Sequence, residues 1–158
     1  MLKIIKATNK DIECIERITK QAFLRYQKKI NTSIKLDALY ETTDDIIFDI
    51  KMNAVFVAKQ EDKVLGAIRY KILDKKSAYI YRFAVDACID TTGVGSALLE
   101  FTTKQLAKCK VSAVCLHTNV NYLSLCRYYQ NHGFVLDSVC SKNGYPRGLF
   151  IKKLEKEN

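Results

Sequence analysis

The stretch FAVDACIDTTGVGSALLEF, residues 83–101, joins a strand-like apolar run to a helical pattern through two glycines. The apolar run ends at Val85, and Gly93 and Gly95 stand where the helical pattern begins. A helix N-terminus exposes backbone N–H groups and a partial positive charge, and glycine has no Cβ that would obstruct a bound phosphate. The stretch therefore predicts a phosphate-binding turn. The alternative is a tight turn that needs glycine only for its backbone angles.

Two common phosphate loops do not match these letters. The P-loop pattern G-x-x-x-x-G-K-[ST] is absent from the chain. The dinucleotide-binding pattern requires a small residue where Leu98 stands, and an acidic residue about 20 positions later that is also missing. That pattern normally follows the first strand of a fold, whereas several strand-like runs precede the glycines here. Both nucleotide-binding classes are therefore excluded.

Apolar periodicity on either side of this stretch predicts a mixed α/β sheet (α+β in type) that forms one domain over residues 1–158. Asn9 is the expected N-cap of the first helix, and Gly133 the expected stop of the last. Expected strands are residues 2–7, 54–60, 63–73, 77–85, 113–118, 134–141 and 147–154, and expected helices are residues 12–29, 36–52, 121–132 and one that starts at the glycines. The early strands are expected to be antiparallel, with a crossover helix after the fourth.

The composition favours a soluble cytoplasmic enzyme or binding module. Of the 158 residues, 48% are hydrophobic and 27% charged, which is ordinary for a globular domain. No apolar run approaches the roughly 18 residues of a membrane span. Six cysteines without a C-x-x-C spacing indicate reduced, packed thiols, and only two histidines argue against a metal site.

A net charge of +9 is compatible with nucleic acid, a membrane surface or a small anionic ligand. The lysines are scattered, and the chain has neither an arginine-rich run nor a recognisable nucleic-acid motif. We therefore expect no nucleic-acid or membrane partner, and an anionic cofactor suits the basic surface.

Two segments together resemble the GNAT acetyltransferases. VDACIDTTGVGSALLEF, residues 85–101, resembles the family's acyl-CoA motif [QR]-x-x-G-x-[GA]. LHTNVNYLSLCRYYQNHGFV, residues 116–135, resembles its second signature, N-x-x-A-x-x-x-Y-x-x-x-G-F, with Tyr129, Gly133 and Phe134 on the Tyr, Gly and Phe positions. The resemblance spans nearly the whole chain. It implies the GNAT fold and an N-acetyltransferase that moves an acetyl group from acetyl-CoA to a primary amine by direct attack.

The resemblance also assigns site residues. It gives Tyr129 the role of general acid toward the coenzyme A thiolate, and it directs the backbone N–H of Val85 at the thioester oxygen. Contacts to acetyl-CoA or coenzyme A are implied for Phe83, Ala84, Val85, Asp90, Thr91, Thr92, Gly93, Val94, Gly95, Ser96, Asn121 and Tyr129. Tyr128 has the same chemistry as Tyr129 but faces another direction on a helix.

The chain departs from the family's pattern at three positions. Asp90 stands where the family usually has Arg or Gln, Tyr122 replaces the motif asparagine, and Leu125 replaces a small residue. A carboxylate aimed at a pyrophosphate would repel it. The Asp90 side chain is therefore expected to cap the helix or face solvent, and Asn121 is expected to substitute for the missing asparagine.

No residue is an evident general base, because the fourth strand lacks the glutamate that some family members carry there. Tyr79, Tyr81 and His117 are candidates, and a water relay or capture of the neutral amine would also serve. For the acceptor amine, the segment with Tyr40, Glu41 and Asp44 offers carboxylates to a cationic substrate, and Tyr81 and Tyr145 are further candidates. The acceptor class stays open among polyamines, aminoglycosides, amino acids and protein amines.

Two alternatives to an enzyme remain from the sequence. The altered motif positions and the missing base are compatible with a non-catalytic acyl-CoA sensor or regulatory module. The net charge alone suggests a nucleic-acid-binding protein. The family resemblance further implies a homodimer formed through the last strands.

Overall fold

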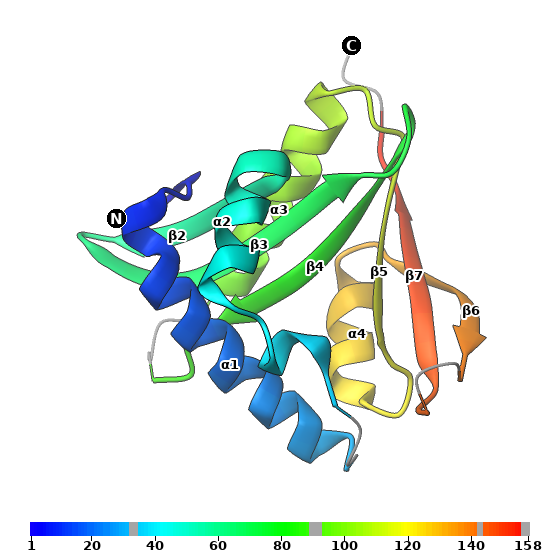
Figure 1. The fold of residues 1–158 in the computed structure, drawn as a ribbon. Coiled ribbons are helices and arrows are strands. Elements are labelled where there is room, and N and C mark those ends of the chain that lie inside the picture. The colour runs from blue at the N-terminus through cyan, green and yellow to red at the C-terminus, as the bar shows by residue number, and fades with distance from the viewer. Residues whose placement is uncertain (32–34, 89–92, 142–143, 156–158) are drawn as a thin grey trace.

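The computed structural model describes residues 1–31, 35–88, 93–141 and 144–155 (Figure 1). The described strands are β1 (Leu2–Lys6), β2 (Ala54–Gln60), β3 (Lys63–Ile72), β4 (Ser77–Val85), β5 (Ala113–Asn119), β6 (Val135–Cys140) and β7 (Arg147–Lys153). The helices are α1 (Ile12–Lys29), α2 (Thr43–Met52), α3 (Val94–Lys108) and α4 (Leu123–Asn131), with 3-10 turns η1 (Asn9–Asp11) and η2 (Asp37–Leu39). The predicted element order and the mixed α/β class are confirmed.

The strands form one sheet in the order β1-β2-β3-β4-β5-β7-β6. Every neighbouring pair is antiparallel except β4 and β5, which are parallel. This parallel pair holds only from Ser77↔Ala113 to Tyr79↔Cys115. Beyond Tyr79 the two strands diverge, as Figure 1 shows, and the V-shaped gap between them positions the site.

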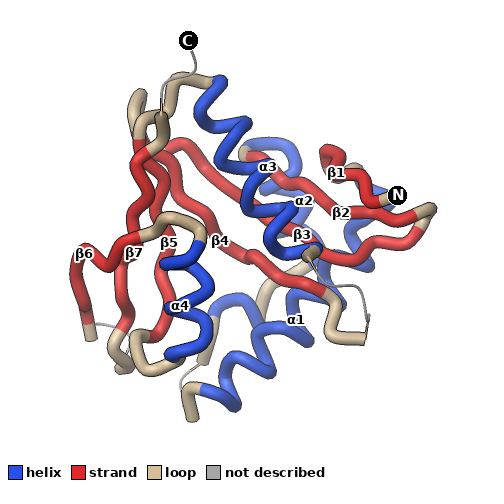
Figure 2. Tube along the Cα trace, turned by 180° about the vertical axis from the view of Figure 1, so that it is seen from behind, coloured by secondary structure: helices blue, strands red, loops and turns tan. Residues whose placement is uncertain are grey.

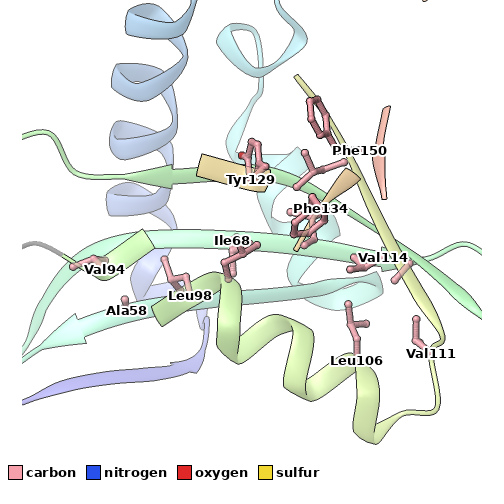
Figure 3. Packing of buried hydrophobic residues seen from close by; sticks show 14 of the residues in the cluster. Ala58, Ile68, Val94, Leu98, Leu106, Val111, Val114, Tyr129, Phe134 and Phe150 are labelled. Atoms are coloured by element: carbon pink, nitrogen blue, oxygen red, sulfur yellow. The ribbon is translucent and has the colours of Figure 1, made fainter. Parts of the chain in front are cut away.

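Helices cover both faces of the sheet: α1 and α2 lie on one face, and α3 and α4 on the other (Figures 1 and 2). Ile15, Ile18 and Ile46 pack under α1 and α2. On the other face Leu98, Leu106 and other α3 side chains pack on the sheet, and Tyr129, Phe134 and Phe150 extend this core toward α4 (Figure 3). In both cores the apolar stripe of each helix is buried against an apolar face of the sheet. The apolar periodicity of the sequence predicts this packing.

The start of α1 differs from its predicted form, because Asn9 is not the cap. Thr8 is extended and its backbone N–H donates to Asp11 Oδ2 at 2.9 Å, so a 3-10 turn precedes the helix. The Asp11 carboxylate also pairs with Lys59 Nζ at 2.6 Å. Asp11 therefore satisfies a free N–H at the helix start and anchors it to β2, which Asn9 cannot do.

The predicted helix over residues 36–52 is in fact two pieces. Thr42 is extended (φ −100°, ψ 166°), its hydroxyl accepts from the Asp45 N–H at 3.3 Å, and its own N–H donates to Asp45 Oδ2 at 2.9 Å. This reciprocal capping box begins α2 at Thr43. The segment before it, which contains η2, is free to approach the sheet.

Within the described residues, no helix is both long and apolar enough to cross a membrane. All six cysteines lie in that part of the chain, and none of them forms a disulfide there.

Candidate active site

A cavity of about 640 Å³ occupies the gap between β4 and β5. Its walls come from α1, η2 and the residues before it, the C-terminal half of β4, the start of α3, β5, α4 and the segment leading into β7. Of the residues predicted to bind the cofactor, those that line it are Phe83, Ala84, Val85, Gly93, Gly95, Ser96 and Tyr129. Segments far apart in the sequence therefore meet where the sheet splits.

The β4 edge of the cavity has backbone groups without a strand partner. The Asp86 N–H donates to the Leu65 carbonyl of β3 at 2.8 Å. Because successive residues of a strand point their N–H and C=O groups to opposite edges, those of Val85 point into the gap. The Val85 carbonyl there accepts a hydrogen bond from Arg25 Nη2 at 3.3 Å. The edge is thus an open hydrogen-bonding surface for an extended ligand.

A β-bulge shapes the same edge. Ala67 of β3 pairs with Ala84 while Arg69 pairs with Tyr81, so β4 carries one extra residue between them. Arg82 in the bulge has φ 51°, a left-handed conformation that is uncommon for a residue with a side chain. The bulge leaves Arg82 and Tyr81 on the α1 and α2 side, where Arg82 approaches Glu41.

The two glycines at the start of α3 are needed for different reasons. Gly93 is the N-cap and has φ 89°, and a Cβ there would meet nothing within 4 Å, so only its backbone conformation favours glycine. At Gly95, by contrast, a Cβ would lie 3.0 Å from the Tyr128 hydroxyl and 3.4 Å from Val85 Cγ2. Gly93 is therefore a glycine needed for its backbone angles. Gly95 is instead a glycine needed because neighbouring side chains lie close to its Cα. Val94 between them is buried in the core, and its side chain does not line the cavity.

Three polar side chains adjoin this turn. His132 Nδ1 lies 2.8 Å from the Tyr128 carbonyl, which can only accept, so Nδ1 carries the proton. In the neutral ring Nε2 then accepts from the Ser96 hydroxyl at 3.1 Å. The Ser96 oxygen also lies 3.4 Å from the Tyr128 hydroxyl. This cluster fixes the orientation of Ser96 at the cavity wall.

Tyr129 lies beside Phe134 and Phe150 (Figure 3), with ring centroids 5.8 Å and 6.3 Å away, and its ring centroid is 6.5 Å from that of Phe83. Its side chain is 8% exposed and lines the cavity. Among the described residues its hydroxyl has no hydrogen-bond partner. Burial raises the pKa of Tyr129 far above its usual range, so the hydroxyl keeps its proton at neutral pH. Tyr128 also lines the cavity, but its hydroxyl points to Ser96.

On the α1 and α2 side the cavity holds all three candidate bases. The Tyr79 hydroxyl lies 2.7 Å from His117 Nδ1, and Tyr81 accepts a hydrogen bond from Asn53 Nδ2 at 3.2 Å. Burial lowers the pKa of His117, and the positive charge of Arg147 lowers it further. Burial raises the pKa of Tyr81, and so does Asp49. His117 is therefore the neutral proton acceptor of the three at physiological pH.

The family model described as Acetyltransferase (GNAT) family matches residues 20–134. The chain belongs to this family. Ard1 from Thermoplasma volcanium aligns with a TM-score of 0.78 at 22% identity, covering 98% of this chain and 99% of that chain. The PaiA N-acetyltransferase from Thermoplasma acidophilum, in complex with coenzyme A, aligns with a TM-score of 0.81 at 15% identity, covering 97% of this chain and 99% of that chain. YncA from Salmonella typhimurium, with its cofactor acetyl-CoA, aligns with a TM-score of 0.77 at 13% identity, covering 100% of this chain and 96% of that chain. At these identities the structures show the shared GNAT fold.

Not every site residue predicted from the GNAT motifs can be located in the cavity wall. Asp90, Thr91 and Thr92 fall outside the described residues. Asn121 is exposed and does not line the cavity, and its N–H donates to Asn119 Oδ1 at 2.8 Å. It therefore does not substitute for the motif asparagine as expected. Tyr122, at the asparagine position itself, lines the cavity and stacks on Tyr26 at 5.9 Å.

The prediction that Glu41 and Asp44 present carboxylates to an amine is wrong. Glu41 forms two hydrogen bonds to the fully buried guanidinium of Arg69, the Nη2–Oε2 distance being 2.8 Å. Asp44 and Tyr40 are exposed, and neither they nor Glu41 line the cavity. Tyr81 and Tyr145 do line the cavity, and their contact with an acceptor stays a prediction.

Sequence reasoning missed the arginines and the α1 residues of this GNAT site. Arg25, Arg82 and Arg147 line the cavity, and so does Tyr26, whose hydroxyl accepts the Asn119 N–H at 2.8 Å. Burial raises the pKa of Tyr26 to about 12. Tyr26 could have been predicted from its place near the end of a helix that covers β4 and β5. No local sequence pattern indicates that the three arginines line the cavity.

Proposed function

We propose that this GNAT protein is an N-acetyltransferase that transfers the acetyl group of acetyl-CoA to a primary amine by direct attack, with Tyr129 as general acid. The observation that carries the proposal is the cavity between the splayed strands, where the open β4 edge, the α3 N-terminus and Tyr129 converge. The relatives solved with coenzyme A and acetyl-CoA support the choice of cofactor.

The cavity walls fit the cofactor's chemistry. The Val85 N–H, which points into the gap, and its neighbours Phe83 and Ala84 suit an extended amide-bearing pantetheine arm, which would pair with β4 as an added strand. The α3 start at Gly93, Gly95 and Ser96 suits a pyrophosphate, because backbone N–H groups and the helix dipole favour anions there. The missing Cβ of Gly95 supports this fit, because the space left beside Tyr128 is the space that a side chain would fill.

Tyr129 would supply the proton for the leaving sulfur. Acetyl-CoA brings an acyl thioester, and its transfer leaves a thiolate that must be protonated. The Tyr129 hydroxyl keeps its proton because burial raises its pKa, and it has no competing protein partner among the described residues. The Val85 N–H, which points into the same gap, would stabilise the charge that develops on the thioester oxygen.

His117 would accept the proton of the attacking amine. Its lowered pKa keeps the ring neutral, and a neutral imidazole has one free lone pair. When Nδ1 donates to the Tyr79 oxygen, Nε2 is the accepting atom. His117 would therefore take the place of the glutamate base that some family members carry on the fourth strand.

The test has two stages. Coenzyme A and acetyl-CoA, each at ~100-fold excess over its Kd, should raise the Tm by about 5–10 °C. Thiol release from acetyl-CoA should then depend on an added primary amine, followed with a panel of diamines, aminoglycosides, amino acids and peptides. No stabilisation by either form of the cofactor would refute the proposal. If the cofactor stabilises the protein but no amine of the panel causes thiol release from acetyl-CoA, the protein is an acyl-CoA sensor instead.

A further inference from the structure

The cavity wall carries more positive than negative charge, because Arg25, Lys35, Arg82 and Arg147 line it and Asp37 is the one carboxylate among its described lining residues. Tyr79, Tyr81 and His117 lie on the sheet face covered by α1 and α2, since their neighbours Ile80 and Leu116 belong to the opposite core. Arg147 lies on the same face, because it and Leu149 alternate with Phe150 of that core. Arg82 and Arg147 both line the cavity there.

Two carboxylates on this side of the sheet, which do not line the cavity, are already paired with a buried guanidinium. Glu41 and Asp49 both bind the Arg69 guanidinium, with Asp49 Oδ2 2.9 Å from Nη1. Arg82 reaches Glu41 only through Nε at 3.5 Å, and that buried Nε has no hydrogen-bond partner among the described residues. Arg82 is therefore the second cation on a pair of carboxylates that Arg69 holds with better geometry.

Arg147 forms no ion pair within the described residues. Its guanidinium is half-buried, interacts with the Tyr79 hydroxyl and disfavours a proton on His117. A guanidinium offers a planar fork of donors that matches a carboxylate. An unpaired guanidinium in a cavity wall is therefore a receptor for an anionic group of a ligand.

The register of β5 and β7 sets how far that anionic group lies from the reacting amine. His117 is opposite Leu149, so Arg147 is its diagonal neighbour on the same face. Diagonal neighbours of an antiparallel pair are roughly 7–8 Å apart at their Cα atoms. A ligand that binds Arg147 by a carboxylate and offers its amine to His117 must carry both groups within a few bonds.

Building on the proposed N-acetyltransferase activity, we propose that the acceptor is a small primary amine that also bears a carboxylate, of the amino-acid type, held by Arg147. Cationic polyamines and aminoglycosides fit this wall less well, because its cationic side chains outnumber Asp37, the one carboxylate among the described lining residues. The cofactor's phosphates do not compete for Arg147, because their expected site at the α3 N-terminus adjoins Tyr128 and His132 of the opposite layer.

The test compares amines that differ only in the carboxylate. kcat/KM is measured with alanine against alaninamide, and with 4-aminobutanoate against butane-1,4-diamine, by thiol release. We expect each amino acid to be favoured by on the order of 10- to 100-fold, the range of a charge-assisted pair. A preference for alaninamide or for the diamine would overturn the proposal, and this comparison needs no variant to fold.

Variants then assign the preference to the arginines. Arg147→Gln should raise KM for the amino acid on the order of 10- to 100-fold, with a smaller effect on kcat and an unchanged coenzyme A Kd. Arg127→Gln, which removes an exposed arginine of α4 outside this cavity, is the matched control. Equal KM values in both variants, or a loss confined to coenzyme A binding, would overturn the role of Arg147. If coenzyme A binds to neither variant nor the parent protein, the proposed function itself fails.

Discussion

The Tyr79 hydroxyl lies 2.7 Å from His117 Nδ1 across the two strands, at the last register pair before β4 and β5 separate. Tyr79 is in that pair with Cys115, and His117 is the second residue beyond it. The hydrogen bond therefore fixes the histidine ring at the edge of the gap. A ring held this way, with its pKa lowered by burial, is prepared to accept a proton at neutral pH.

Replacing His117 tests this role. His117→Asn should lower kcat at pH 7 by on the order of 100-fold, because the amine loses its proton acceptor. Since the pKa of His117 is lowered below its ordinary value of 6.5, the parent enzyme should keep activity as pH falls through 6.5 and lose it only at lower pH. A pH profile of kcat measures both effects.

Tyr79→Phe keeps the aromatic ring and removes only the hydrogen bond to His117, so it should have an intermediate effect on kcat. If His117→Asn retains full activity with the same pH profile, a water relay or capture of the neutral amine takes the place of the histidine.

Tyr129→Phe tests the general acid. Removal of the hydroxyl should reduce kcat by on the order of 100-fold while the coenzyme A Kd changes less than about twofold. Stability should hardly change, because that hydroxyl has no protein partner among the described residues. Tyr70→Phe, at a tyrosine that stacks on Phe56 outside the cavity, is the control. Equal turnover in the two variants would remove Tyr129 from the reaction.

The two glycines should respond differently to alanine. Gly93→Ala should lower the free energy of unfolding by about 1–2 kcal/mol, because a residue with a Cβ is strained at positive φ, and should cause no new contact. Gly95→Ala should instead weaken coenzyme A binding, because its Cβ displaces the Tyr128 hydroxyl from 3.0 Å. Denaturant unfolding and calorimetric titration separate these effects.

The double variant Gly95→Ala/Tyr128→Phe removes the atom that the new Cβ meets, and it should recover part of the lost affinity. Unchanged coenzyme A binding by Gly95→Ala alone would show that the cofactor does not use this space.

Local patterns predicted most of the fold and part of the cavity wall. Apolar periodicity and the glycines located the strands and helices, and the second signature, residues 116–135, led to Tyr129. What failed depends on distant partners. No local pattern pairs Glu41 with Arg69, because the two residues are 28 positions apart in the sequence. The bulge at Arg82 and the position of Arg147 on the sheet face follow from strand register, which residue type alone does not specify.

Arg69 carries the last prediction, since it is fully buried and holds Glu41 and Asp49 together beneath α2. Arg69→Met would leave two poorly solvated carboxylates with Arg82 as their one remaining cationic partner among the described residues, so the free energy of unfolding should fall by about 3–5 kcal/mol. Lys20→Ala, which breaks the partly exposed pair with Glu16, should cost less than about 1 kcal/mol. Urea unfolding at pH 7 compares the two. A small effect at Arg69 would mean that Arg82, whose Nε lies 3.5 Å from Glu41, moves in to neutralise the carboxylates.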